Sequence, residues 1–256
     1  MNGKRNRILV VTFANDLPAH DLSLFRGAVI STVGQEHVLF HNHQGDKLRY
    51  SYPLVQYKRI GGKAALVCLG AGADDVGEFF ANNTSPLQIG DRSETFVVER
   101  VSPRNVVTQI WQDMFTYTIR KYLPLNQENY QRYMAMDSLA EQYALLERCL
   151  TGNILSFAKS LGIHFESTVV VKISQVLGTK TYRYKNVKLQ GFDLVFKTNV
   201  SLPDYIGFVF AKTKREVTEQ QAAQLKAMLN PQIKAVGVFV NAEIDLIVRL
   251  AASRTI

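Results

Sequence analysis

The first hundred residues predict a mixed unit of strands and helices. Runs rich in β-branched and aromatic side chains predict strands, and apolar residues at helical spacing predict helices. Asp21 and Gly34 stand where the N-cap and the stop of the first helix are expected, and Gly61-Gly62 suits a tight hairpin. The predicted order is strand, helix, strand, strand, helix and strand, over residues 7–13, 21–34, 48–70 (two strands), 72–83 and 94–101. This is the ferredoxin-like order, in which helices cover one face of a four-stranded sheet.

A second unit of the same kind is expected to follow. Residues 113–125 alternate as a strand, and residues 136–163 are strongly helical, with a break between two helices expected near Thr151-Gly152. Three further strands are expected at residues 167–177, 180–189 and 192–200. No last strand is evident before Gly207, so this second unit is predicted to be incomplete.

From Phe208 the pattern changes. The segments YIGFVF and KAVGVFV are continuous apolar runs, as expected of parallel strands buried on both faces, and each precedes a helical pattern. Such alternation is typical of an α/β barrel or a doubly wound sheet. The sequence therefore predicts an α+β protein in three parts: residues 1–105 and 106–207 as tandem ferredoxin-like (RRM-like) domains, and residues 208–256 as a foreign βαβα tail.

The composition is that of a soluble globular protein with a basic balance. Of the 256 residues, 46% are hydrophobic and 20% are charged; the net charge of +8 permits a polyanionic partner without requiring one. Cys68 and Cys149 lie in apolar runs, which favours free thiols in a reducing cytoplasm over a disulfide. The apolar run near the N-terminus is too short for a secretory signal or a membrane span, so no membrane partner is expected.

The densest group of chemically active side chains lies between residues 41 and 59. His41 and His43 are two apart and would share one face of a strand, and Tyr50 follows after a short turn. Histidine can exchange a proton with a ribose hydroxyl or a leaving oxygen near neutral pH, and a tyrosine hydroxyl can orient the attacking 2′-hydroxyl. The cations that could stabilise charge on a phosphate are Lys47, Arg49, Lys58 and Arg59.

Two other interpretations of the histidine pair stay open. A His-x-His pair can bind zinc, but a zinc site needs a third protein ligand, and no other histidine or cysteine stands at a recognisable spacing. The two histidines can also be solvated side chains at the edge of a loop. Cleavage of RNA by its own 2′-hydroxyl requires no metal, so neither a metal nor another cofactor is expected.

Four segments resemble the CRISPR-associated endoribonucleases that cut repeat RNA into guide units. They are LFHNHQGDKLRYSYPLVQYKRIGGKAALVCLG, LPLNQENYQRY, LLERCLTGNILSFAKSLGI and GFDLVFKTNVSLPDYIG, and they occur in the family's order. The resemblance covers residues 8–207 and implies metal-independent cleavage that leaves a 2′,3′-cyclic phosphate. It also implies a histidine-tyrosine active site, which falls on His43 and Tyr50 with His41 assisting. CRISPR repeat RNA and a CRISPR effector complex are the partners it implies, for a monomer or a homodimer.

The sequence departs from that family after LPDYIG. There the family continues into a glycine-rich basic loop and a final strand, whereas this chain has no glycine between Gly207 and Gly237. The remaining residues resemble the second and third strand-helix units of phosphoribosylanthranilate isomerase, about two of the eight units of such a barrel. The catalytic cysteine and aspartate of that family have no matching positions here, so no isomerase activity is expected. We interpret residues 202–207 as a sequence common to both families at which two genes are joined, in the genome or in sequence assembly.

Three functions remain open from the sequence. The first is the repeat-RNA endoribonuclease, impaired by the replaced C-terminal part. The second is a non-catalytic RNA-binding module with the same folds, and the third is a gene-join product without function. RNA cleavage would separate the first from the other two.

Overall fold

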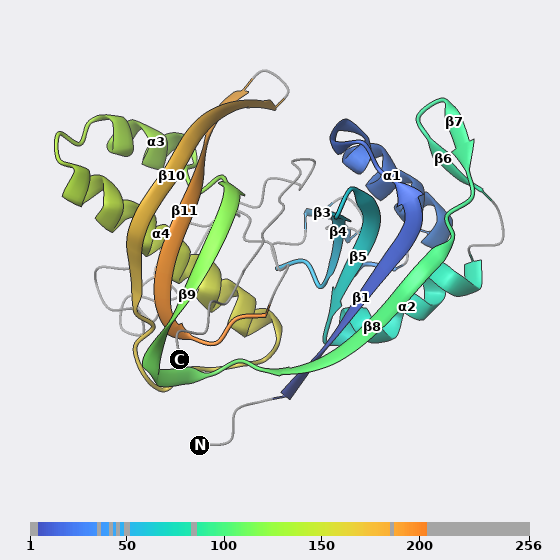
Figure 1. The fold of residues 1–256 in the computed structure, drawn as a ribbon, viewed down its shortest axis with the longest axis horizontal. Coiled ribbons are helices and arrows are strands. Elements are labelled where there is room, and N and C mark those ends of the chain that lie inside the picture. Colours follow the sequence, from blue (N-terminus) through green and yellow to red (C-terminus); the bar gives the residue numbers. More distant parts are fainter. Residues whose placement is uncertain are drawn as a thin grey trace.

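The first sheet contains four antiparallel strands in the order β4-β5-β1-β8. The computed structural model describes residues 5–34, 37–40, 43–44, 47–48, 52–82, 86–184 and 187–203. Figure 1 shows this sheet with helices α1 and α2 on one side. The predicted order of these six elements is confirmed. They are β1 (Arg5–Asp16), α1 (Leu22–Val33), β4 (Val55–Ile60), β5 (Lys63–Leu69), α2 (Ala71–Asn82) and β8 (Val98–Val107).

The hairpin predicted at Gly61-Gly62 joins β4 directly to β5. The φ angles of these two glycines are +62° and +92°, a region that residues with a Cβ atom rarely adopt. Two consecutive positive φ angles match the twist of the strands on either side, so the chain reverses within two residues.

Short elements that the sequence pattern did not predict are inserted between the main ones. They are η1 (Ala19–Asp21), the hairpin of β2 (His43–Gln44) and β3 (Lys47–Leu48), and the hairpin of β6 (Leu87–Ile89) and β7 (Arg92–Glu94). Asp21 occupies the predicted N-cap position of α1, but its carboxylate accepts a 2.5 Å hydrogen bond from Arg92 of β7 and does not cap the helix. The strand expected at residues 94–101 begins later, at Val98, because Glu94 belongs to β7.

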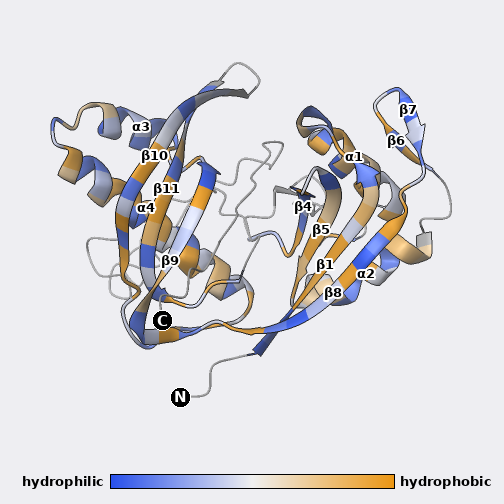
Figure 2. Ribbon diagram, in the orientation of Figure 1, coloured by the Kyte–Doolittle hydropathy of each residue, from blue (hydrophilic) through white to orange (hydrophobic). Residues whose placement is uncertain are grey.

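Strand β5 is buried on both faces, and its alternate residues enter two different cores. Ala64, Leu66 and Cys68 belong to a first core that contains residues of α1 and α2, whereas Val67 and Leu69 belong to a second core that contains residues of α4. Because side chains of a strand alternate between faces, one apolar run supplies both cores. In Figure 2 the orange, hydrophobic residues of this sheet gather on its central strands, while the edge strand β8 is partly blue.

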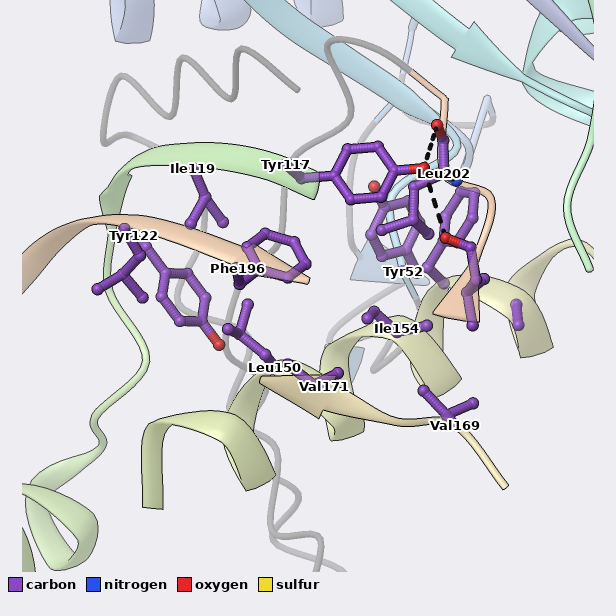
Figure 3. Close-up of a cluster of buried hydrophobic side chains, with 14 of the residues drawn as sticks. Tyr52, Tyr117, Ile119, Tyr122, Leu150, Ile154, Val169, Val171, Phe196 and Leu202 are labelled. Carbon is purple, nitrogen blue, oxygen red and sulfur yellow. Dashed lines mark hydrogen bonds between the residues drawn. The ribbon is translucent and has the colours of Figure 1, made fainter. Parts of the chain in front are cut away.

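The second sheet has three antiparallel strands in the order β10-β11-β9. They are β9 (Ile110–Tyr122), β10 (Val171–Tyr184) and β11 (Val187–Val200), and helices α3 (Gln127–Met134) and α4 (Leu139–Ser160) lie between β9 and β10 in sequence. Figure 3 shows the second core, where Leu150 and Ile154 of α4 meet Phe196 and the aromatic residues of β9. Among the described residues this sheet has no fourth strand.

Two predictions about this second unit are wrong, and one helix was not predicted. The helical stretch does not break near Thr151-Gly152, because α4 runs through it from Leu139 to Ser160. A glycine inside a helix costs only about 1 kcal/mol, and the continuous buried stripe of α4 outweighs that cost. Residues 180–189 are not a separate strand: they contain the end of β10 and the beginning of β11, which pair with each other. Helix α3 was not predicted, because it has no buried residue and therefore no apolar stripe.

The two cysteines are free thiols, as predicted from their apolar surroundings. Burial raises the pKa of Cys68 and that of Cys149 to about 12. No helix within the described part of the chain combines the length and apolar character needed to cross a membrane.

Candidate active site

The predicted catalytic segment forms a short hairpin where the structure describes it. His43 of β2 pairs with Leu48 of β3, and Gln44 pairs with Lys47, so two residues connect the strands. The short turn expected at Gly45-Asp46 lies outside the described residues, between these two paired strands. The side chains of His43 and Lys47 are not described, and His41, Arg49 and Tyr50 lie outside the described residues.

Buried aromatic residues hold the chain on both sides of this segment. On the N-terminal side Phe40 is only 2% exposed and belongs to the first core, and its carbonyl accepts a 2.9 Å hydrogen bond from the Tyr57 hydroxyl. On the C-terminal side Tyr52 is 4% exposed and belongs to the second core. The segment between them thus leaves one core and enters the other.

Tyr52 also joins the two units of the protein. Its ring lies edge-on to that of Phe157 in α4, with 5.3 Å between the ring centroids, and its hydroxyl accepts a 2.9 Å hydrogen bond from Gln56. Ile8, Val67 and residues of the second sheet belong to the same core. The position of the candidate hairpin therefore depends on contacts between the two units.

Tyr57 lies next to the segment but is unsuited to acid-base chemistry near neutral pH. Burial raises the pKa of Tyr57 far above its ordinary value, although the positive charge of Arg26 partly opposes this effect. The neutral phenol donates to Phe40, and the Arg26 guanidinium lies 6.0 Å from the centroid of its ring. This tyrosine therefore has a structural role.

Lys58 and Arg59, both predicted to contact RNA, project from opposite faces of β4. Arg59 faces the side of the sheet that carries α1, where its Nε donates a 2.6 Å hydrogen bond to the carbonyl of Leu17. Lys58 faces the other side and is only 6% exposed. Since neighbouring residues of a strand alternate between faces, these two cations cannot serve one RNA-binding face together.

Two further cations, which the sequence reasoning missed, lie on the same face as Lys58. The strand registers align Lys58 with Ala65, Thr12 and Arg100 in one row across the sheet. Arg104 lies four residues after Arg100 on β8, so its side chain is on the same face of the sheet. The side chains of both arginines are exposed. Polar residues at every second position of VERVSPRNV were the signal, but the strand predicted from the sequence ended at Val101, before Pro103 and Arg104. Proline is tolerated there because β8 is an edge strand.

Two family models match the part of the chain that forms these two units. Residues 5–106 match the Cas6b N-terminal domain, and residues 109–209 match the Cas6b C-terminal domain. Residues 5–209 therefore belong to the Cas6b family. One solved structure, described as a crystal structure of Cas6b, is 25% identical, covers 80% of this chain and 94% of its own, and superposes with a TM-score of 0.72. A second, described as the CRISPR RNA processing endoribonuclease Cas6b, is 24% identical over 80% of this chain and 92% of its own, with a TM-score of 0.60.

A third family model matches the C-terminal part. Residues 186–256 match N-(5′-phosphoribosyl)anthranilate isomerase. The isomerase of Endomicrobium trichonymphae is 47% identical over 58 residues, and that of Listeria innocua is 66% identical over 38 residues. This chain covers 29% and 19% of the length of those two proteins, respectively. The isomerase match overlaps the Cas6b match at residues 186–209, which include the junction predicted at residues 202–207.

Proposed function

We propose that the chain is an endoribonuclease that cleaves CRISPR repeat RNA into guide units without a metal ion. The observation that carries this proposal is the match of residues 5–209 to both Cas6b domains in sequence order. The 2′-hydroxyl next to the scissile phosphate would attack the phosphorus, the 5′-oxygen would leave, and the products would be a 2′,3′-cyclic phosphate and a 5′-hydroxyl. The reaction would take place in the cytoplasm, alone or with a CRISPR effector complex.

The catalytic roles in this proposal belong to the segment between Phe40 and Tyr52. Tyr50 or His41 orients or activates the 2′-hydroxyl, and His43 acts as general acid or base. General acid-base help of this kind contributes about 100-fold to 10,000-fold. Two anchors in different cores restrict the positions that the segment can reach, and positioning of this kind is what an active site made by a loop requires.

The phosphate contacts would come from Lys47, Arg49 and the cations on the face of the first sheet that carries Lys58. Lys58 lies in the same row of that face as Arg100, which makes Arg100 a further candidate. Arg59 is the weakest of the predicted contacts, since its guanidinium is already bonded to the Leu17 carbonyl. The antiparallel strand order and the helices on one face support the assignment of both units to the ferredoxin-like class.

The same proposal holds that the C-terminal part impairs the enzyme. The glycine-rich basic loop that the family carries after LPDYIG is missing from this sequence. Replacement of residues 208–256 by that loop and a final strand is expected to increase cleavage. Equal activity of the two proteins would contradict the impairment but not the catalytic assignment.

Single-turnover cleavage of a labelled repeat RNA in the presence of EDTA tests the assignment. His43→Ala is expected to slow cleavage about 100-fold or more, because the general acid or base is lost. The matched control is His20→Ala, since His20 has an exposed side chain (83%) on η1 and lies outside the segment. Full cleavage by His43→Ala would refute the role of His43. If the parent protein and the variant both bind the RNA in a salt-dependent way and neither forms a product, the non-catalytic RNA-binding module is favoured.

A further inference from the structure

The second sheet lacks a strand that the first sheet has at the equivalent position. In the first sheet β1 pairs with β5 on one side and with β8 on the other. In the second sheet β9 pairs with β11 on one side, and among the described residues no strand pairs with its other side, which we call the open edge. Figure 1 shows β9 as the outer strand of this sheet. The unpaired N–H and C=O groups of such an edge favour pairing with a further strand.

The N-terminal part of β9 is exposed, whereas the equivalent strand of the first sheet is not. Every residue from Trp111 to Met114 is exposed, and these two side chains are 43% and 40% exposed. In β1, which is paired on both sides, Val11 and Phe13 are fully buried. Tryptophan and methionine are enriched where one surface covers another, so this part of β9 has the composition of a covered edge.

The chain leaves both units at equivalent positions. Strand β5 ends at Leu69, opposite Ile8 near the start of β1, and β11 ends at Val200, opposite Ile110 at the start of β9. After β5 the chain forms α2 and returns as β8, so β5 and β8 both run antiparallel to β1. Strands that run in the same direction need a crossover between them, which a helix usually supplies. A strand that runs antiparallel to β9 at the open edge therefore has to follow a helix as well.

The sequence after the described part offers a helix and then a strand. Residues 217–229 have a helical pattern that places Ala222, Leu225 and Leu229 on one side, and Asn230-Pro231 is a suitable end for that helix. The apolar run KAVGVFV follows at residues 234–240. The earlier run YIGFVF comes too soon after β11 for a helix to precede it.

These segments have no barrel to join within this chain. They belong to the isomerase match at residues 186–256, which supplies about two of the eight strand-helix units that close such a barrel. In a complete barrel every strand is paired on both sides. An apolar strand that lacks those neighbours exposes its ladder groups and its side chains, and a free sheet edge can pair with it and cover them.

We propose that residues 234–240 pair with the open edge, antiparallel to β9, as β8 pairs with β1. Residues 217–229 form the crossover helix, on the side of the second sheet that carries α4. A fragment of the isomerase family thus completes the sheet of a Cas6b domain. This inference goes beyond the proposed function and does not depend on RNA cleavage.

Hydrogen exchange of the full chain, followed by NMR, tests the pairing. Val238→Pro/Phe239→Pro removes two consecutive N–H groups, one of which has to face β9, because successive N–H groups of a strand point to opposite sides. The β9 amides on the open edge are expected to exchange at least about tenfold faster, while β5 keeps its protection. The matched control is Val209→Pro/Phe210→Pro, which changes the same dipeptide in YIGFVF and should leave exchange in β9 within about twofold.

Four results would overturn the inference. They are rapid exchange at the open edge of the parent, unchanged exchange in the variant, an equal or larger effect of the control, and protection that rises with protein concentration. The last would assign the edge to a second copy of the chain, and a larger effect of the control would assign it to residues 205–210. If the prolines disturb folding, as measured by circular dichroism, Val238→Gly/Phe239→Gly provides a milder variant with the same expected direction.

Discussion

The first and second cores differ in how their aromatic residues are used. In the first core Phe13, Phe25, Phe79 and Phe96 pack edge-on or stacked on one another, and Tyr57 lies edge-on to Phe25. In the second core the aromatic residues of β9 are tyrosines with defined hydrogen-bond partners: Tyr122 accepts from Asn153 at 2.8 Å, and Tyr117 accepts from the Leu202 amide at 2.8 Å. Packing of rings restricts a core mainly by volume and shape, whereas the hydrogen bonds of the second core also fix individual partners.

The hydrogen bond from the Leu202 amide to Tyr117 holds the end of the described chain in the second core. Leu202 is 8% exposed, and Figure 3 shows it beside the Tyr117 ring. Ser201 is held as well, because its amide donates to the carbonyl of Gln109 at 3.1 Å and its hydroxyl donates to the carbonyl of Val107 at 2.7 Å. The Cas6b packing therefore continues up to the first residue of the predicted junction at 202–207.

The largest expected effect comes from a residue that joins the two units. Phe157→Ala should lower the free energy of unfolding by about 3–5 kcal/mol, since it removes a fully buried ring from the second core and the contact with Tyr52. Urea denaturation followed by circular dichroism measures the loss. Hydrogen exchange should show that β5 and β11 lose protection together.

The matched variant in the other core is Phe13→Ala, which also removes a fully buried ring. A similar loss of stability is expected, again with both sheets affected, because the second core contains strands of both. Loss of protection in the first sheet alone would show that the two units unfold independently.

A smaller effect is expected where the second core binds the chain near the junction. Tyr117→Phe removes the acceptor of the Leu202 amide and should destabilise the protein by about 1–3 kcal/mol, because that buried N–H group loses its partner. Faster hydrogen exchange at Leu202 would locate the effect. Tyr130→Phe on α3, where the side chain is 40% exposed, should change stability by less than about 0.5 kcal/mol. Equal effects of the two variants would mean that the Tyr117 bond does not hold the chain there.

The smallest effect concerns pH and the buried thiol of the first core. Because burial raises the pKa of Cys68 to about 12, from 9.0, the folded state favours the protonated thiol. This contribution is complete below about pH 9 and is lost as the pH rises towards 12. Measured between pH 8 and 11, the unfolding free energy of the parent should fall more steeply than that of Cys68→Val, which has no thiol to titrate. Parallel curves would contradict a buried, protonated thiol at this position.

The local pattern of the sequence predicted the elements whose signals are confined to a few residues. Gly61-Gly62 predicted a hairpin because few other residues accept two positive φ angles in succession. The β-branched and aromatic residues of β1 and the helical spacing of α1 were equally direct signals. The break predicted near Thr151-Gly152 was wrong, since the apolar stripe of α4 packs on a sheet whose strands come from distant parts of the chain.

The candidate site shows the same division. The sequence by itself determined the residue types at 41–50 and the change of family after LPDYIG. Only the tertiary structure decided that Phe40 and Tyr52 enter different cores, that Lys58 and Arg59 face opposite ways, and that Arg100 lies in the row of Lys58. The physical reason is that strand register and packing between units depend on contacts between residues far apart in the chain, which no local pattern of hydrophobic and polar residues contains.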